Sequence, residues 1–408
     1  MEASLQGIFA SCFTHYAEGR RLSLRAHKAA QAIINCRTSE LGGHVQRCPD
    51  GHVTRVQYNS CRHRSCPRCA ALPKARWCEA QQARLLACDH FHVVFTLPHE
   101  LLELWLLNRS WFIDALFQSC RDTLMTLQKD TRYLGAEPGI VMSLHSWGRT
   151  LSLHPHIHCL VTGGGLTPAS HWKAVRGGYL LPVRVVKALY KGKLLARLWA
   201  ALQSDVLRLP KGGSYMQVAR LLKAVGRKAW NVRLQERYAH GRGVMRYLAR
   251  YVKGGPIRDR RVLTADARSV CFRYTDHRDG RSKTLRLATE HFITRVLWHV
   301  PEPGQHTIRH YGLYSHKARP KRALCRAQLG QAPESEEIEP MDWQRFMDEC
   351  GAKDKGCCPT CGKRLVGMLP FGARRNTNSI ARSQRDCLVQ QGVQVGAPTW
   401  LLGTGPPP

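Results

Sequence analysis

The chain has 408 residues, of which 43% are hydrophobic, and its 62 Lys and Arg against 29 Asp and Glu give a formal net charge of +33. It is too long for one ordinary core, it has no run approaching the ~20 apolar residues that span a bilayer, and its first thirty residues lack a signal-peptide pattern. We therefore expect two or three domains in a soluble, intracellular protein whose working partner is a polyanion. Nucleic acid is favoured over an anionic membrane, because no basic amphipathic helix is evident.

The N-terminal part combines helical periodicity over residues 5–34 with clustered cysteines. Seventeen cysteines in an intracellular chain indicate metal thiolates rather than disulfides. Cys66 and Cys69 form a C-x2-C knuckle, and tetrahedral zinc needs two more ligands. The nearest thiolates are Cys61 and Cys48, and the alternatives are Cys36, His44, His52 and His63. Basic residues around the knuckle predict that it braces a DNA-facing loop, with Arg62, Arg64 and Arg68 as DNA contacts.

The middle of the chain predicts two strands and a helix, followed by a histidine-rich strand. Residues 91–97 and 140–145 have strand character, and residues 101–127 have helical periodicity. From Leu153 to Val161 apolar residues alternate with His154, His156 and His158. A strand with imidazoles along one face is typical of a divalent metal site. The following glycines, 163–165, predict a turn.

Two histidines around one bulky residue also occur by chance, so His156 and His158 need a further ligand to make a convincing site. His145 lies eleven residues before His156, which is far enough for it to come from a neighbouring strand or loop. His154 is the alternative, and it ranks behind His145.

A second candidate site is the helical segment that ends at Gly254-Gly255-Pro256. Val244, Leu248 and Val252 form its apolar stripe. Tyr247 and Tyr251, four residues apart, share one face, beside the basic residues Arg246, Arg250 and Lys253. An isolated pair of this kind would be a buried tyrosine pair. Next to a histidine metal site in a basic chain, the two tyrosines instead suggest nucleophiles.

The remaining segments carry weaker signals. Residues 270–288 predict a β-hairpin with an Asp279-Gly280 turn. Residues 316–322 predict a basic linker, and the chain from Gly367 onward predicts a loose end. Between them, Cys357, Cys358 and Cys361 form a lone knuckle, to which Cys350 could add a ligand, with no second pair evident.

This order of motifs resembles the rolling-circle transposases of the IS91 family, within the HUH endonuclease superfamily. The resemblance runs from about residue 11 to 315, through the cysteine module, the strand at 91–97, His156-Ile157-His158 and the Tyr247/Tyr251 segment. Two positions depart from the family: Gly51 and Ser65 stand where a Cys and a His are common.

The resemblance implies an α+β fold, in which an HUH nuclease domain with a central antiparallel sheet flanked by helices follows a small zinc-binding domain. The expected boundaries are 1–89 for the N-terminal helices and zinc domain, 90–315 for the catalytic domain and 316–408 for a basic, partly disordered tail. It also implies a structural zinc held among Cys36, Cys48, Cys61, Cys66 and Cys69. His156, His158 and His145 would hold Mg²⁺ or Mn²⁺.

The implied activity is nicking and rejoining of single-stranded DNA at the ends of an insertion sequence. Tyr247 or Tyr251 would attack the phosphate to give a 5′-phosphotyrosine. The partners would be DNA and the host replication machinery, in the bacterial cytoplasm at the nucleoid. The alternatives are a replication initiator or relaxase with the same chemistry, and a non-catalytic zinc-dependent DNA-binding protein.

Overall fold

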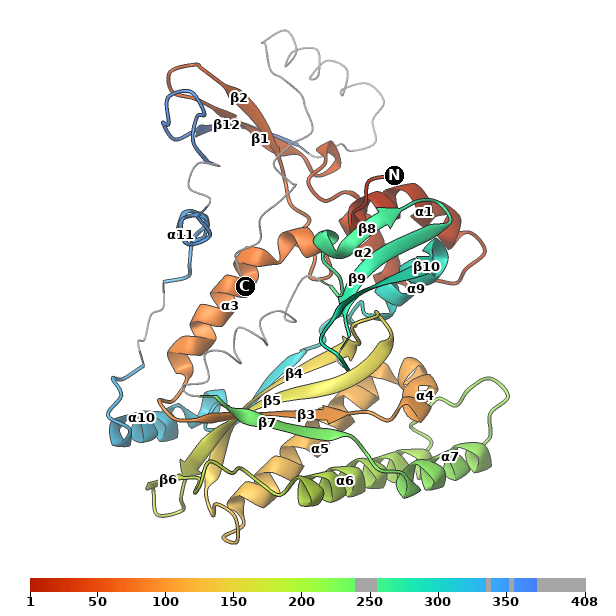
Figure 1. The fold of residues 1–408 in the computed structure, drawn as a ribbon, viewed down its shortest axis with the longest axis vertical. Coiled ribbons are helices and arrows are strands. Elements are labelled where there is room, and N and C mark those ends of the chain that lie inside the picture. Colours follow the sequence, from red (N-terminus) through yellow and green to blue (C-terminus); the bar gives the residue numbers. More distant parts are fainter. Residues whose placement is uncertain (239–254, 277, 335–338, 352–355, 373–408) are drawn as a thin grey trace. The chain divides into compact units, whose positions relative to one another are not determined.

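The protein is described by a computed structural model covering residues 1–238, 255–276, 278–334, 339–351 and 356–372 (Figure 1). The chain forms two compact units. Unit 1 consists of Met1–Arg76, Lys253–Val300 and Glu339–Pro408, and unit 2 of Trp77–Val252 and Pro301–Ile338. These units differ from the consecutive domains expected at 1–89, 90–315 and 316–408, because segments far apart in the sequence contact each other: residues 366–371 pair with 43–47, and residues 289–298 contact 5–17.

Unit 2 is built on an antiparallel sheet whose strand order differs from the order of the strands in the sequence. Its strands follow the order β11-β4-β5-β3-β7, and β6 pairs with one end of β5. The long strand β5, with the histidines at its start, therefore lies in the middle, and the expected α+β fold with a central antiparallel sheet is confirmed. The strands are β3 (His90–Thr96), β4 (Glu137–Trp147), β5 (Leu153–Leu166), β6 (Trp172–Ala174), β7 (Val232–Tyr238) and β11 (Ile308–Gly312).

One face of this sheet carries the main hydrophobic core. Apolar residues of the strands, such as Phe95, Met142 and Ile157, pack with Phe112 and Tyr190 of the helices that cover this face (Figure 1). The expected helix over 101–127 is interrupted at residue 108, which separates α4 from α5. The covering helices are α4 (Leu102–Leu107), α5 (Arg109–Lys129), α6 (Val183–Gln203) and α7 (Tyr215–Arg227).

A second hydrophobic cluster packs on the other face of the sheet. Val141 of β4 and Leu160 of β5 pack there with Leu86, Tyr314 and Cys325. These residues connect the sheet with the end of α3 (Ala71–Arg84) and with α10 (Arg319–Gln328). The cluster occupies the later half of β5, and the histidines lie on the same face in the earlier half, because both sets have even numbers along the strand.

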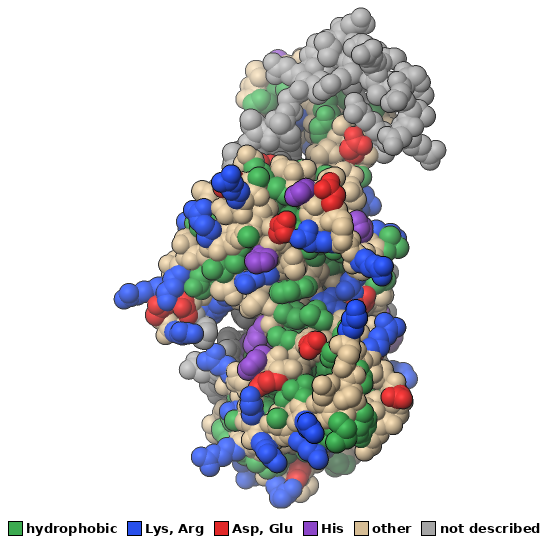
Figure 2. Space-filling model, turned by 90° about the vertical axis from the view of Figure 1, so that its right-hand side faces the viewer, with side chains coloured by type: hydrophobic (Ala, Val, Ile, Leu, Met, Phe, Trp, Pro, Cys, Tyr) green, Lys and Arg blue, Asp and Glu red, His purple; other side chains and the backbone are tan. Residues whose placement is uncertain are grey.

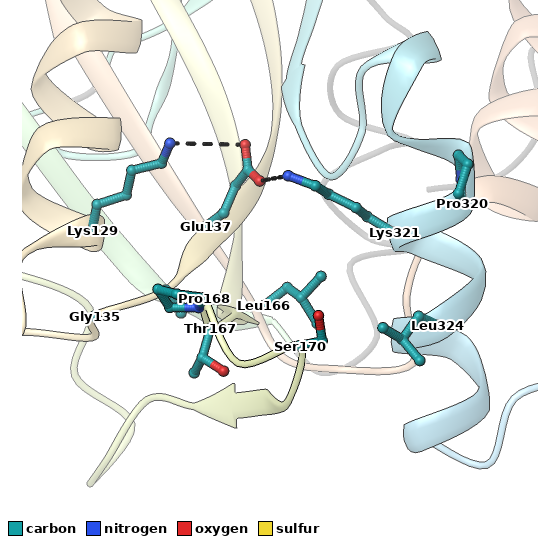
Figure 3. A pocket seen from close by; sticks show the side chains of 11 residues that line it. Lys129, Gly135, Glu137, Leu166, Thr167, Pro168, Ser170, Pro320, Lys321 and Leu324 are labelled. Atoms are coloured by element: carbon teal, nitrogen blue, oxygen red, sulfur yellow. Dashed lines mark hydrogen bonds and ion pairs between the residues drawn. The ribbon is translucent and has the colours of Figure 1, made fainter.

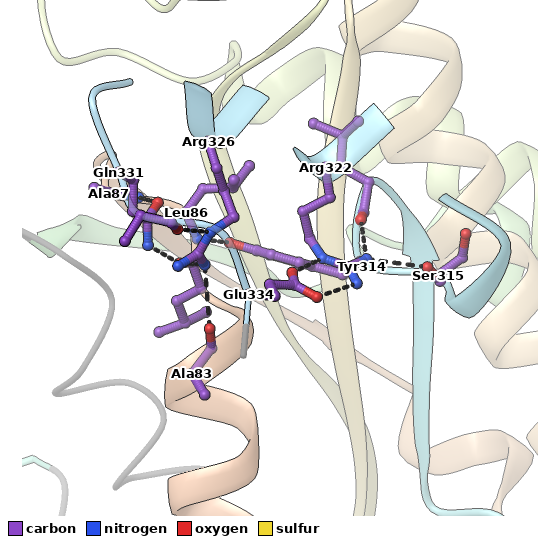
Figure 4. A network of polar contacts seen from close by, with 12 residues as sticks. Ala83, Leu86, Ala87, Tyr314, Ser315, Arg322, Arg326, Gln331 and Glu334 are labelled. Atoms are coloured by element: carbon purple, nitrogen blue, oxygen red, sulfur yellow. Dashed lines mark hydrogen bonds and ion pairs between the residues drawn. The ribbon is translucent and has the colours of Figure 1, made fainter. Parts of the chain in front are cut away.

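The basic segment at 316–322 is part of a folded element, not a linker. It forms a short 3-10 turn and the start of α10, and Arg322 is only 4% exposed. Its guanidinium donates to the carbonyl of Leu313 at 2.8 Å and pairs with Glu334 (Figure 4). Arg326, one turn later, donates to Ala83 O at 3.1 Å. These arginines join backbone carbonyls, so part of the basic surplus is structural.

The three glycines expected to make a turn instead continue β5. Their lack of a side chain allows close approach of neighbouring groups. A Cβ on Gly164 would lie 2.5 Å from Cζ2 of Trp172, and one on Gly165 would lie 2.5 Å from the carbonyl oxygen of Glu137 on β4. Glycine at these positions therefore permits tight packing against β4 and β6 rather than a change of direction.

Unit 1 contains the N-terminal helix pair and the expected hairpin. Ser4 and Ser23 cap the two helices through their side-chain oxygens. The hairpin strands pair in register, and Gly280 in the turn has φ of 68°. The hydroxyl oxygen of Tyr16 lies 2.9 Å from the hydroxyl oxygen of Thr294. The elements are α1 (Leu5–Ala17), α2 (Leu24–Ile34), β8 (Val262–Ala265), β9 (Ser269–Thr275), β10 (Ser282–Ala288) and α9 (Thr289–Trp298).

A second small sheet of unit 1 joins strands that are far apart in the sequence. β1 (Gly43–Arg47) lies between β2 (Thr54–Tyr58) and β12 (Val366–Phe371). The segment expected to be loose from Gly367 onward thus begins as a paired strand, and residues 373–408 lie outside the described part. A short helix, α11 (Trp343–Glu349), precedes it. Among the described residues, no helix is long and apolar enough to span a membrane.

The glycine packing leads to a stability prediction. We expect Gly165→Ala to lower the free energy of unfolding by about 1–3 kcal/mol, because its Cβ meets the backbone of β4, which cannot rotate away. Gly192→Ala, in the interior of α6 with open space around the Cβ, should raise it by about 0.5–1 kcal/mol. Urea denaturation of both variants would check this. Equal stability of the two variants would contradict it.

Candidate active site and metal centres

The strand register of unit 2 brings the histidines together. β4 and β5 are antiparallel neighbours, and His145 is the direct partner of His156 across them. His158 lies two residues further along β5 and points to the same face. The spacing of eleven residues between His145 and His156 is therefore the length of a hairpin. Its turn is closed by a hydrogen bond from Gly148 N–H to Ser152 O at 2.9 Å.

The three imidazoles can act as ligands to one metal ion. His145, His156 and His158 each offer a ring nitrogen within 4.8 Å of the others. The ring centroids of His145 and His158 are 4.1 Å apart, and those of His156 and His158 are 4.7 Å apart. His145 and His158 are buried and His156 is half-buried, so the group opens towards His156. His154, on the same face, is exposed and is not part of this group.

A fourth histidine, His92 on β3, orients one of the three. Its Nε2 lies 2.8 Å from Nδ1 of His158, and the two rings stack at 19°. If His158 donates from Nδ1, its Nε2 keeps a lone pair for a metal ion. His156 is oriented similarly, because its Nδ1 lies 2.6 Å from the carbonyl oxygen of His154, which can only accept. His92 is not among the ligands predicted from the sequence, because its only signal there is a polar residue within a strongly apolar strand.

The surroundings keep these imidazoles neutral. Burial lowers the pKa of His156 to about 3, and the neighbouring histidines add to this effect. Burial also lowers the pKa of His145 and His158 well below the ordinary histidine value. A neutral imidazole retains the lone pair that a metal ion needs.

The predicted nucleophiles lie outside the described residues. This holds for Tyr247 and Tyr251 and for the basic residues beside them, Arg246, Arg250 and Lys253. The described chain stops at β7, which pairs with β3 at the edge of the same sheet, and resumes at Gly255.

Four cysteines of unit 1 form a group suited to tetrahedral zinc. Cys36, Cys61, Cys66 and Cys69 place their sulfurs within 4.8 Å of one another. The Sγ atoms of Cys36 and Cys69 are 3.3 Å apart, and those of Cys61 and Cys69 are 3.6 Å apart. Bonds of ~2.3 Å to one zinc ion would separate sulfurs by ~3.8 Å. The structure does not bring Cys48 to this group.

The three arginines expected to contact DNA have different surroundings. Arg62 is exposed and has φ of 53° at the loop before the knuckle. Arg64 is half-buried. Arg68 is held within unit 1, where its guanidinium lies 3.3 Å from Asp259 and 3.2 Å from Glu2. Arg62 therefore has the surroundings that suit a DNA contact, whereas Arg68 braces the fold.

A pocket of about 470 Å³ in unit 2 lies at the opposite end of β5 from the histidines, near Leu166 (Figure 3). Glu137 projects into it between two lysines, at 2.7 Å from Lys321 and 4.0 Å from Lys129. Glu137 neutralises one of the two lysines, and the pocket shares no residue with the histidine group.

Two family profiles match the chain. The profile described as "Putative transposase" matches residues 139–322, which include His145, His156 and His158. The profile described as "Transposase zinc-binding domain" matches residues 8–97, which include the four-cysteine group. The class of protein is therefore a transposase with an N-terminal zinc-binding domain.

Two relatives match almost the whole chain. It is 36% identical over 370 residues to "Putative transposase y4qJ" of Sinorhizobium fredii, covering 86% of this chain and 92% of the relative. It is 30% identical over 407 residues to "Transposase for insertion sequence element IS801" of Pseudomonas savastanoi pv. phaseolicola, covering 93% and 94%. The chain belongs to the IS91 family of rolling-circle transposases.

Solved structures of the conjugative relaxase TrwC with DNA are also similar. The metal-bound complex with oriT DNA has a TM-score of 0.23 and 14% identity, over 40% of this chain and 72% of that one. The metal-free complex has a TM-score of 0.23 and 16% identity, over 41% and 67%.

The contact between His92 and His158 leads to a second prediction. We expect His92→Ala to weaken Mn²⁺ binding by about 10- to 100-fold, because His158 would lose the partner that orients its ring. His90→Ala is the matched control: His90 is also buried, two residues earlier on β3, but it contacts Tyr314 instead. Mn²⁺ titration followed by electron paramagnetic resonance would measure both affinities. Equal affinities for the two variants would contradict the role of His92.

Proposed function

We propose that this transposase nicks and rejoins single-stranded DNA at the ends of its insertion sequence through a 5′-phosphotyrosine intermediate. The observation that supports it is the group of His145, His156 and His158 on the central strands of unit 2. The residues are close together and neutral, and they open to one side of the sheet. Family membership supports a transposase over a replication initiator or a non-catalytic DNA-binding protein.

These three histidines would hold one divalent cation, Mg²⁺ or Mn²⁺. When bound, such a cation polarises a phosphodiester and stabilises the negative charge that develops during attack. The contribution of the chain is positional: the β4–β5 register sets the spacing of His145 and His156, and His92 orients His158. These neighbours are inside the sheet, so the ligands are preorganised.

Tyr247 or Tyr251 would be the nucleophile. Its phenolate oxygen forms a bond to phosphorus while the bond from phosphorus to the 3′ oxygen breaks, and that oxygen takes up a proton as a free 3′-OH. Arg246, Arg250 and Lys253 beside the tyrosines would favour the phenolate form. One phosphoester replaces another, so no nucleotide cofactor is required. Two tyrosines allow two successive transfers, one at each end of the element.

The charge of the chain suits a DNA substrate. Lys and Arg side chains are spread over the face shown in Figure 2, with Asp and Glu side chains interspersed, and in the whole sequence they outnumber Asp and Glu by 62 to 29. Exposed residues such as Arg62 would contact the phosphate backbone of single-stranded or locally melted DNA. The free 3′-OH could prime synthesis by the host replication machinery. A protein with this substrate would work at the bacterial nucleoid.

The central experiment is incubation with labelled single-stranded DNA of the element's ends and Mn²⁺, followed by detection of DNA-linked protein. We expect His156→Ala and His158→Ala to reduce the rate of adduct formation by about 100-fold or more, since loss of a ligand removes several kcal/mol of charge stabilisation. His154→Ala is the control, because His154 is exposed and outside the group. Unchanged adduct formation in the His156 and His158 variants would contradict the proposed site.

The tyrosines require a separate test. We expect Tyr247→Phe and Tyr251→Phe each to remove adducts at one of the two ends, and the double variant to remove them at both, because phenylalanine has no attacking oxygen. Mapping of the DNA-linked peptide by mass spectrometry would identify the residue. Tyr238→Phe, at the end of β7, serves as the control. Adducts that persist in the double variant would overturn the nucleophile assignment.

A further inference from the structure

The turn between β1 and β2 carries two metal-binding side chains that the proposed chemistry does not use. Cys48 follows β1 and His52 precedes β2. The backbone N–H of Cys48 donates to Val53 O at 2.8 Å, and that of Gly51 donates to Cys48 O at 3.0 Å. This tight turn places Nδ1 of His52 3.7 Å from Sγ of Cys48. Cys48 is buried and His52 is exposed, so the thiol and the imidazole lie side by side at a position that opens to solvent on the side of His52.

The lone knuckle near the C-terminal end of the described chain has the geometry of a metal-binding turn. The backbone N–H of Cys358 donates to Lys363 O at 2.8 Å, and that of Gly362 donates to Cys358 O at 2.9 Å. The backbone N–H groups of Thr360 and Cys361 hydrogen-bond to Sγ of Cys358. The two sulfurs of the C-x2-C pair therefore project from one side of the turn.

The knuckle and the β1–β2 turn meet, although 313 residues separate Cys48 from Cys361. Their Sγ atoms are 3.5 Å apart, and the ligand atoms of Cys48, His52, Cys358 and Cys361 all lie within 4.8 Å of one another. A tetrahedral zinc ion with ~2.3 Å bonds to sulfur would separate its sulfur ligands by ~3.8 Å. A disulfide would instead require sulfurs ~2.05 Å apart and only two of these groups.

We propose that Cys48, His52, Cys358 and Cys361 form a second structural zinc site of the Cys3His type, which fastens the C-terminal knuckle to the N-terminal zinc-binding domain. It is separate from the group of Cys36, Cys61, Cys66 and Cys69, and the two groups share no residue. Cys357 is adjacent to the knuckle in sequence but is not a member of either group.

The contacts around the site explain why a metal ion is needed there. Within the described part of the chain, the apolar cluster around it is small, with Cys48, Cys358 and Leu365 buried. An ion pair of 2.8 Å joins Lys363 to Asp50, and both partners are partly exposed. Exposed pairs contribute little, and such a small core cannot hold a remote segment. Zinc ligation supplies folding energy directly, so the site would hold β12 against β1.

The test is the zinc content of the purified full chain, measured by elemental analysis and by native mass spectrometry without added reductant. We expect two zinc ions per chain in the wild type and one in Cys358→Ser/Cys361→Ser. Cys357→Ser is the matched control and should retain two. A wild type with one zinc ion, a double variant with two, or a mass two hydrogens lower that indicates a disulfide would each overturn the proposal.

A second measurement excludes general unfolding as the cause of zinc loss. In the double variant, amide hydrogen exchange should become faster in β12, while the exchange rates of α1 and α2 stay unchanged. The zinc ion of the four-cysteine group should remain bound. Co²⁺ substitution should give the spectrum of a three-thiolate site in the wild type that is absent from the double variant. Unchanged exchange in β12 would contradict the proposal that the zinc ion holds β12 against β1. This result does not depend on whether the protein nicks DNA.

Discussion

The pairing of β4, β5 and β3 is the constraint on which the candidate active site depends. Antiparallel register makes His145 the partner of His156 and sets His92 diagonally beside His158. A shift of one residue in either pairing would turn these imidazoles to the opposite face, where the main hydrophobic core lies. The apolar residues between the histidines prevent such a shift, because Ile157 and Cys159 are completely buried in that core. Core packing thus sets the geometry of the site.

The charge of the chain has two uses. Arg68, Arg322 and Arg326 contact carboxylates or backbone carbonyls within the fold, so they contribute to folding. The larger remainder gives a basic surface that suits a polyanionic substrate. The histidine group differs from both, because burial keeps it uncharged. A neutral set of ligands inside a basic protein can accept a cation without first losing protons at physiological pH.

In unit 1, β12 pairs with β1, and this pairing explains which cysteines lie together. Spacing along the sequence identifies the knuckles, since a C-x2-C turn is local. It assigned Cys48 to the Cys66–Cys69 knuckle as the nearest thiolate, whereas the fold places Cys48 beside a knuckle more than three hundred residues away. The knuckle at Cys358 has no second pair nearby in the sequence, because its partners in the fold, Cys48 and His52, come from the N-terminal part of the chain. Distance along the chain does not limit contact once β12 pairs with β1.

The sequence by itself predicted a polyanion partner, and it determined the strand that carries His156 and His158, the helices and hairpin, and the resemblance to the IS91 family. These depend on composition, on local periodicity and on motif order, which require no long-range information. Only the tertiary structure decided which residues join His156 and His158, that His92 supports them, that glycines 163–165 continue a strand and that residues 316–322 begin a buried helix. Each of these depends on the register and packing of segments distant in sequence, because a side chain's neighbours are set by strand pairing and not by its position in the chain.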